Sequence, residues 1–248
     1  MTRLFAREVA VQQRLFWRSR ESAFFTFLLP ILFLVLLGSV YGDDEIEGIK
    51  ASTYLVAGLL GYGIVATAFA GLAITLVLRR ESGVLKRVRG TPLPTGVYLG
   101  AVIVSTLVVI ALEACAQVLV GRFLLAASWP RSPALLALVS LFGAAAFAAL
   151  GIAITSAVRS AEGSSAVVNA IYLPLAFVSG VFYSVDALPR FLEALASVSP
   201  LTYLLRLIRD TFVAGTALDA GDAAVLALWG VAGVVVAVRA FRWEPRGG

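Results

Sequence analysis

Residues 53–78 read TYLVAGLLGYGIVATAFAGLAITLVL and contain no charged side chain. An α-helix rises about 1.5 Å per residue, so roughly 20 apolar residues cross the ~30 Å hydrocarbon layer of a bilayer. A sheet with open edges would leave backbone groups unpaired in lipid, and the run is too long for a barrel strand. We therefore expect this stretch to form a membrane-spanning helix.

The rest of the chain repeats this pattern. Of its 248 residues, 60% are hydrophobic and only 14% are charged, and the mean hydropathy is +0.94. A soluble domain of this length carries more charge. We predict an all-α integral membrane protein in which residues 1–248 form a single transmembrane domain. Its six transmembrane helices are expected at residues 23–41, 53–78, 96–120, 133–158, 164–183 and 222–238.

The positions of lysine and arginine predict the orientation of these helices. Fourteen of the 20 basic residues lie in the N-terminal segment, the connections after the second and fourth spans, and the C-terminal tail. The positive-inside rule therefore places both termini in the cytoplasm. These residues form short blocks beside apolar runs, so the net charge of +5 does not indicate a nucleic-acid partner. The fourteen are Arg3, Arg7, Arg14, Arg18, Arg20, Arg79, Arg80, Lys86, Arg87, Arg89, Arg159, Arg239, Arg242 and Arg246.

Several kinds of chemistry find no support in the sequence. The chain has no histidine, and its one cysteine, Cys115, lies in an apolar run, so we expect no disulfide framework and no metal site. No Gly-x-x-x-x-Gly-Lys-Ser/Thr loop or Gly-x-Ser-x-Gly elbow occurs. We expect no catalytic residue and no cofactor on this chain. The first apolar run lacks a cleavage site, which indicates a retained span.

The N-terminal segment, residues 1–22, has two faces. At 100° per residue its four arginines from Arg3 to Arg18 fall within about 60° of one another, and Phe5, Val9 and Phe16 lie opposite. This pattern predicts an amphipathic helix in the membrane interface. The alternative is a basic leader whose charges only set the topology.

Residues 79–92 connect the second and third predicted spans. Val84, Leu85 and Val88 form an apolar ridge at helical spacing, basic side chains flank it, and Gly90 and Pro92 end it. The pattern is typical of a docking helix, whose ridge enters a groove on a partner while its charges orient it. The alternative is a loop that is basic only for topology.

The outer segment, residues 186–215, contains two helix signatures. Asp186 can cap a first helix, Ser199 and Pro200 can begin a second, and Gly215 can end it. Neither helix is long enough to span the bilayer. We predict two re-entrant helices that enter the outer leaflet, with two helices lying flat on the surface as the alternative.

Two segments resemble type-two (ABC-2-type) permeases of ABC transporters. The first, with Glu81, Gly83 and the turn Thr91-Pro92-Leu93, resembles their cytoplasmic coupling region. The second resembles them more closely, and Ser184 and Val185 depart from it where members often have proline. Its motifs are Pro174-Leu175, Ser179-Gly180-Val181-Phe182, Leu188-Pro189, Pro200-Leu201-Thr202-Tyr203, Arg209 and Gly215.

The resemblance is greatest to drug-efflux permeases of the daunorubicin-resistance type, in a bacterial cell membrane. It implies a pair of permeases, as a homodimer, bound to two ATPase subunits that hold ATP and Mg²⁺. It also implies export of an amphipathic or lipid-like substrate, such as a drug, lipid or glycan. The implied ATPase-coupling residues are Glu81, Gly83, Lys86, Arg87, Arg89, Thr91 and Pro92, and the outer motif comprises Pro189, Pro200, Thr202, Tyr203 and Arg209.

Polar side chains inside the spans are candidates for a substrate pathway. Glu113 shares a helix face with Gln117, about 26 Å from the start of the third predicted span and thus toward the outer leaflet. Asn169 and Tyr172 lie in the fifth, where bonding between helices is the alternative. Glu113 can instead be a structural carboxylate. It can also be the proton site of an ion-coupled carrier, although the chain shows no repeated halves. A non-transporting scaffold fits the hydropathy equally well.

Overall fold

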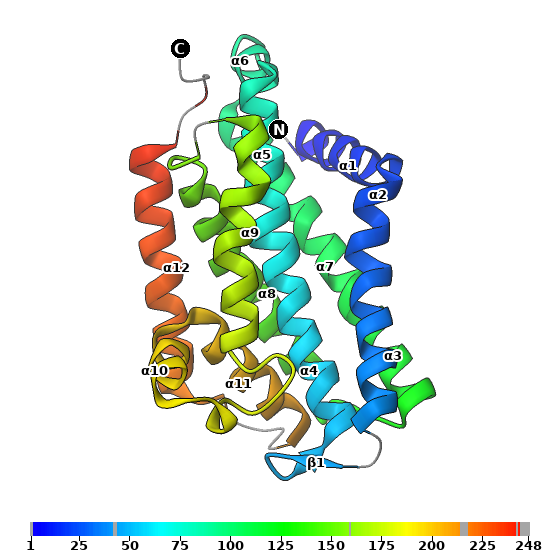
Figure 1. Cartoon of the computed structure of the whole chain (residues 1–248). Coiled ribbons are helices and arrows are strands. Elements are labelled where there is room, and N and C mark those ends of the chain that lie inside the picture. The colour runs from blue at the N-terminus through cyan, green and yellow to red at the C-terminus, as the bar shows by residue number, and fades with distance from the viewer. Residues whose placement is uncertain (1, 42–43, 159, 214–217, 242, 244–248) are drawn as a thin grey trace.

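The computed structural model describes residues 2–41, 44–158, 160–213, 218–241 and 243. Predictions that rest on Arg159, Gly215, Arg242 or Arg246 lie outside these residues. Within the described part, six helices are long and apolar enough to cross a membrane, and they form one bundle (Figure 1). The predicted fold class is confirmed. The six are Arg20–Tyr41, Ala51–Glu81, Thr95–Leu125, Pro133–Ile154, Ala161–Val178 and Ala220–Ala240.

The first two spans each contain a π-helical segment. The first consists of α2 (Arg20–Ala23), η1 (Phe24–Leu28) and α3 (Leu29–Tyr41). The second consists of α4 (Ala51–Ile64), η2 (Val65–Gly71) and α5 (Leu72–Glu81). The others are single helices: α7 (Thr95–Leu125), α8 (Pro133–Ile154), α9 (Ala161–Val178) and α12 (Ala220–Ala240).

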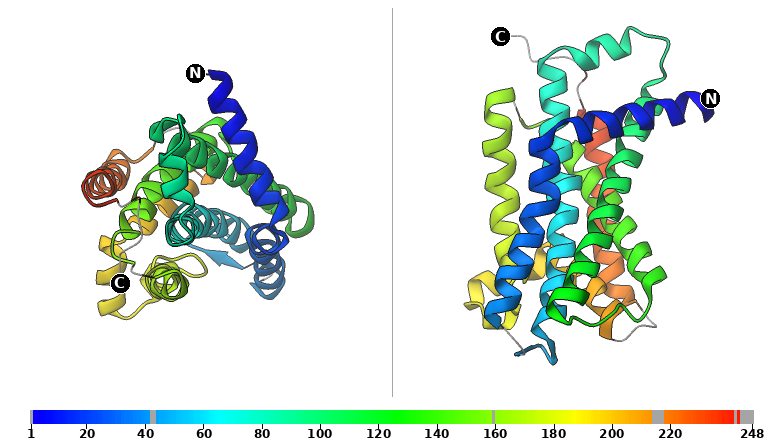
Figure 2. Two further views of the ribbon diagram at one scale, coloured as in Figure 1. Left: turned by 90° about the horizontal axis from the view of Figure 1, so that it is seen from above. Right: turned by 90° about the vertical axis from the view of Figure 1, so that its right-hand side faces the viewer.

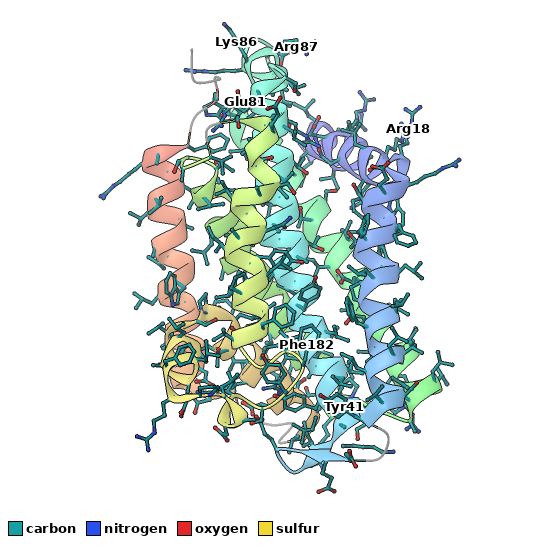
Figure 3. All side chains as sticks on the ribbon, viewed as in Figure 1. Arg18, Tyr41, Glu81, Lys86, Arg87 and Phe182 are labelled. Carbon is teal, nitrogen blue, oxygen red and sulfur yellow. The ribbon has the colours of Figure 1, made fainter. Side chains whose placement is uncertain are left out.

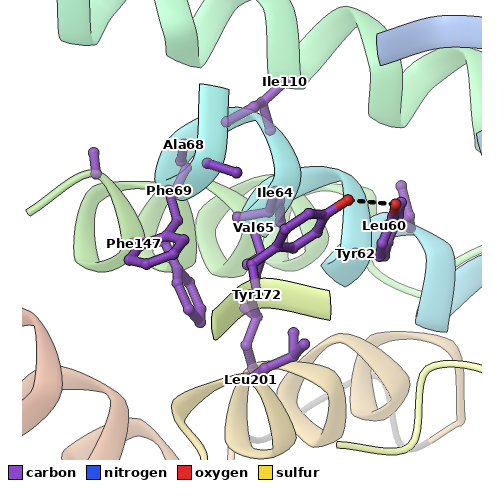
Figure 4. Close-up of a cluster of buried hydrophobic side chains, with 14 of the residues drawn as sticks. Leu60, Tyr62, Ile64, Val65, Ala68, Phe69, Ile110, Phe147, Tyr172 and Leu201 are labelled. Carbon is purple, nitrogen blue, oxygen red and sulfur yellow. Dashed lines mark hydrogen bonds between the residues drawn. The ribbon is translucent and has the colours of Figure 1, made fainter. Parts of the chain in front are cut away.

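The second span forms the centre of the bundle, as the view from above shows (Figure 2). In its most apolar window 72% of the residues are buried, against 17% in the first and sixth spans. A helix that is apolar on all sides suits this position. Tyr62, Val65 and Phe69 belong to the cluster that packs against neighbouring helices here (Figure 4).

The helix α1 (Thr2–Arg18) lies across one end of the bundle, turned away from the direction of the spans (Figure 2). It packs against α7, and Phe5, Val9 and Phe16 are half-buried. Phe5 lies beside Gly100 of α7, and the ring of Phe16 lies 6.4 Å from that of Phe27 in the first span. Gln13 donates from Nε2 to the carbonyl oxygen of Ser105 at 2.8 Å. The four arginines from Arg3 to Arg18 are exposed, so the two predicted faces are present.

Several helices end where hydropathy did not predict. The fourth span stops at Ile154 rather than 158, and the fifth starts at Ala161 because Ser160 Oγ accepts a hydrogen bond from Gly163 N at 3.1 Å. The fifth ends at Val178 rather than 183, because Gly180 takes φ +88° and turns the chain. Caps and turns, rather than apolar content, set these ends.

The outer segment begins differently from the prediction. Asp186 caps no long helix, because it lies inside a short 3₁₀ turn, η3 (Val185–Ala187). Its own backbone N–H donates to Ser184 Oγ at 3.2 Å. The helix α10 (Arg190–Val198) starts only after Pro189. A second helix, α11 (Pro200–Val213), follows at an angle of 79°, and Ser199 Oγ accepts from Leu201 N at 3.2 Å.

These two helices have different surroundings. The helix α11 packs against α4, α8 and α12, and most of its side chains are buried, so it does not lie flat on the surface. The helix α10 exposes Phe191, Leu195 and Val198. Insertion of the pair into the outer leaflet stays a prediction. A small hairpin of β1 (Glu45–Ile46) and β2 (Ile49–Lys50) lies at the same end of the bundle (Figure 1).

Candidate functional site

The connection between the second and third spans forms a short helix, α6 (Val84–Arg89), at the end of the bundle where α1 lies (Figure 1). Gly83 precedes it with φ +71°, a left-handed conformation that suits glycine. Lys86 and Arg87 are exposed at the tip of this end of the bundle (Figure 3). The other predicted coupling residues are the half-buried Glu81 and the exposed Arg89, Thr91 and Pro92.

The apolar ridge of α6 does not face outward as predicted. Leu85 is 0% exposed and belongs to the core of this chain, and Val84 and Val88 are half-buried. The prediction that this ridge enters a groove on a partner is therefore wrong for Leu85. A helix of six residues is not stable by itself and depends on packing against the rest of the protein, which Leu85 provides here. The surface that remains for a partner is basic.

Arg80, at the end of α5, is only 2% exposed and uses its guanidinium to join two parts of the bundle. Nη1 donates to the carbonyl oxygen of Thr155 at 2.9 Å and Nη2 to that of Val158 at 2.8 Å. Nε donates to Glu81 Oε1 at 2.8 Å. Because Thr155 and Val158 directly follow α8, Arg80 fixes the base of α6 to the connection between α8 and α9.

Glu113 and Gln117 of α7 face the second span and are both buried. Gln117 donates from Nε2 to Glu113 Oε1 at 3.0 Å, and Thr67 Oγ1 donates to Glu113 Oε2 at 3.4 Å. Thr67 belongs to η2, and π-helical segments often occur at functional positions. Two donors thus surround a carboxyl group inside the bundle.

The depth of Glu113 differs from the predicted one. Its carboxyl group lies beside Gly63 and Thr67, near the middle of the 31-residue helix Ala51–Glu81. The sequence placed it toward the outer leaflet because it lies about 26 Å along the helix from Gly96, the start of the predicted third span. The helix α7 continues beyond that predicted span to Leu125. Glu113 therefore lies at about half the height of the bundle.

Tyr172 belongs to a second group. Its hydroxyl shares a hydrogen bond of 2.5 Å with that of Tyr62 on α4 (Figure 4), and the ring of Phe182 lies 6.4 Å from that of Tyr62. Asn169 donates from Nδ2 to Ser165 Oγ at 3.2 Å on the exposed side of α9. The predicted pathway residues therefore do not form one group. Glu113 and Gln117 bond to each other, Tyr172 bonds to Tyr62, and Asn169 lies apart from both pairs.

At the opposite end of the bundle, Arg209 of α11 holds the turn that follows α9. It donates from Nη2 to the carbonyl oxygen of Gly180, and its Cζ lies 3.8 Å from the ring centroid of Tyr54. Tyr54 in turn donates to the carbonyl oxygens of Gly180 at 3.1 Å and Tyr183 at 2.9 Å. Arg209 Nη1 also lies 3.9 Å from Glu47 Oε2. Arginine and tyrosine together fix the Ser-Gly-Val-Phe turn.

The other residues of the predicted outer motif shape α10 and α11. Pro189 and Pro200 stand at the two helix starts. Tyr203 donates to the carbonyl oxygen of Ser197 at 2.5 Å, across the bend between the helices. Thr202 is buried, and its hydroxyl has no partner among the described residues.

Gly63 provides a test of how tightly Glu113 is held. A Cβ at position 63 would collide with the Glu113 carboxyl group, which cannot move without breaking its bonds to Thr67 and Gln117. We expect Gly63→Ala to lower the free energy of unfolding by about 1–3 kcal/mol, measured by thermal unfolding in detergent. Gly96→Ala is the control, because the space at Gly96 is open. Equal stability of the two variants would contradict the packing described.

The sequence of this chain also matches known proteins. Residues 4–213 match the family described as ABC-2 type transporter. The chain belongs to the ABC-2 type transporter family. It is therefore a transport permease, the membrane subunit of an ABC exporter, and members of the family act together with an ABC ATPase. The predicted resemblance to type-two ABC permeases is confirmed.

Curated relatives of this ABC-2 permease are also transport permeases. The inner membrane transport permease YadH of Escherichia coli (strain K12) is 26% identical over 187 residues, which cover 74% of this chain and 70% of the relative. The putative transport permease YvfS of Bacillus subtilis (strain 168) is 24% identical, with 74% and 75% covered. The linearmycin resistance permease protein LnrN of the same organism is 25% identical, with 80% and 50% covered.

Several residues that make contacts within these sites could not be predicted from the sequence. Arg80 was counted only as a topology charge, and the signal available was its position next to Glu81. Tyr62 and Thr67 lie in an apolar run where periodicity assigns no partner. Tyr54 carried no signal, because its contacts with Gly180 join residues 126 positions apart.

Proposed function

We propose that two copies of this ABC-2 permease form a homodimer that binds two copies of an ABC ATPase and exports an amphipathic or lipid-like substrate. ATP and Mg²⁺ bind to the ATPase subunits. Both termini and α6 face the cytoplasm of a bacterial cell. One relative is named as a linearmycin resistance permease, which supports a drug as the substrate, and a lipid or a glycan-bearing lipid is the other class to test.

The observation that carries the proposal is the attachment of α6. Its exposed surface is basic and suits an acidic groove on an ATPase, while Leu85 and Arg80 tie it to the bundle. When nucleotide binding brings the two ATPase subunits together, a rigidly attached α6 moves with them. Arg80 passes this displacement to the connection between α8 and α9, and the spans repack from inward-open to outward-open states.

The proposed substrate pathway uses both groups of buried polar residues. Tyr62, Tyr172 and Phe182 offer aromatic surface to an apolar substrate. Glu113 and Gln117 offer hydrogen bonds near the middle of the bundle. Arg209 closes the outer end of the pathway by holding the turn at Gly180.

Reconstitution tests this function. The permease is purified with the ATPase that co-purifies with it, and both are inserted into vesicles that contain a fluorescent phospholipid analogue. We expect ATP-dependent movement of the analogue that ceases when the ATPase is omitted or its Walker lysine is replaced. A panel of amphipathic drugs serves as the second substrate class.

Two other outcomes would replace the proposal. Transport that continues without the ATPase and is lost on Glu113→Gln would identify an ion-coupled carrier. Neither flux nor stimulation of ATP hydrolysis, with any substrate of the two classes, would identify a scaffold. Gly96→Ala is the matched control for insertion and assembly, because its site is open.

A further inference from the structure

A cleft of about 300 Å³, with both apolar and polar side chains on its walls, lies between α1, the first and second spans, and α7. It is lined by Gln12 and Phe16 of α1, by residues of the first span such as Thr26, and by Thr75 and Arg79 of α5. Hydroxyl groups are numerous on its walls. Unpaired polar side chains inside a membrane raise the free energy of the protein unless a polar group or water bonds to them.

Three side chains in the cleft have hydrogen-bonding capacity to spare. Within the described part of the chain, the hydroxyls of Thr26 and Thr75 form no hydrogen bond. Arg79 donates from Nη1 to Tyr98 OH at 2.9 Å, and its other N–H groups have no partner among the same residues. A guanidinium can bind an oxyanion through two parallel hydrogen bonds, which is why arginine favours phosphate and carboxylate groups.

The position of the cleft along the bundle indicates which kind of molecule could carry such an anion. Arg79 is two residues from the end of the second span at Glu81, and Ser19, also on the cleft wall, marks the bend between α1 and the first span. These are positions where a membrane protein meets the lipid headgroups. Deeper in the cleft, Leu72 and Val109 add apolar surface. The cleft therefore suits a ligand with a charged end and an apolar remainder.

The charge of the cleft indicates the kind of headgroup. Among the described lining residues there is one cation, Arg79, and no aspartate or glutamate. A zwitterionic headgroup would leave its ammonium group beside this arginine with no carboxylate to receive it. We propose that the cleft binds the phosphate headgroup of an anionic phospholipid, whose phosphate pairs with Arg79 and whose glycerol oxygens accept from Thr26 and Thr75. The lipid thereby joins α1 to the first three spans, independently of any transport function.

Native mass spectrometry of the full chain in detergent tests this site. Phosphatidylglycerol and phosphatidylcholine with identical acyl chains are added in separate titrations. We expect one phosphatidylglycerol molecule to stay bound at concentrations at which phosphatidylcholine does not. Arg79→Gln should weaken this retention about tenfold, as expected for the loss of a charge-assisted hydrogen-bond pair, and Arg79→Lys should keep most of it.

Two further variants separate binding from folding and from general charge. Thr26→Val removes a hydroxyl that has no internal partner, so it should fold normally and still lower the retention. Arg87→Gln removes the same charge from the same end of the bundle but outside the cleft, and should retain the lipid like the unaltered chain.

Three results would overturn the proposal of a lipid site. Equal retention of the two lipids by the unaltered chain would overturn the proposal, as would unchanged retention in both Arg79→Gln and Thr26→Val. Displacement of phosphatidylglycerol by millimolar inorganic phosphate would assign the cleft to a free anion rather than to a lipid.

Discussion

Replacing Arg80 by leucine will destabilise the permease strongly, because Arg80 is buried and joins α5 to the connection between α8 and α9. The substitution leaves the carbonyl oxygens of Thr155 and Val158 and the carboxylate of Glu81 without their donor. Removing one partner from a buried charged pair costs about 3–5 kcal/mol. In a chain of this size we expect the midpoint of thermal unfolding to fall by on the order of 10 °C.

The measurement is thermal unfolding in detergent, followed by the fluorescence of the four tryptophans. Arg18→Leu is the matched control, because Arg18 is an exposed arginine at the same end of the bundle. Arg80→Lys should recover only part of the stability, since an ammonium group cannot reach three acceptors arranged for a planar guanidinium. If Arg80→Leu and Arg18→Leu unfold at the same midpoint, the hydrogen bonds of Arg80 do not contribute to the stability of the permease.

Reversing the charge of Arg87 and Arg89 together will abolish the stimulation of ATP hydrolysis by substrate. Both side chains are exposed on α6, so the double variant Arg87→Glu, Arg89→Glu should insert and fold like the unaltered permease. A partner surface that is complementary to arginine repels glutamate, and an interface with like charges opposed costs several kcal/mol. We expect loss of both co-purification and stimulation.

The assay compares ATP hydrolysis with and without substrate in reconstituted vesicles, alongside membrane fractionation of the variant. Arg190→Glu is the control, because Arg190 is equally exposed but lies on α10 at the other end of the bundle. Unchanged stimulation in the double variant would remove α6 from the coupling mechanism while leaving the fold intact.

The six spans could be predicted from the sequence because hydropathy depends only on local composition. The helix ends could not, since they depend on single caps. Ser160 begins α9, and the left-handed Gly180 directs the chain away after it. The sequence indicated Asp186 as a cap, whereas in the structure Ser184, two residues earlier, caps the turn η3. A sequence pattern does not distinguish such neighbours, because the choice depends on how the following turn packs.

In the candidate site, the sequence predicted correctly only the side chains that are both charged and exposed. The basic surface of α6 follows from the sequence, but the burial of Leu85 does not, since an apolar ridge suits a partner's groove as well as the chain's own core. The pairing of Glu113 with Thr67 depends on η2, whose π-helical register departs from the 3.6-residue period used to assign faces. Contacts between side chains of different helices cannot be predicted without knowing how the helices pack.

The burial of Leu85 has a consequence for how such permeases diversify. Anchorage and recognition are encoded by different positions within one short helix, so selection can alter either without disturbing the other. Since these three side chains are exposed, we expect that exchanging only Lys86, Arg87 and Arg89 for the residues of a related permease changes the choice of ATPase while the scaffold stays intact.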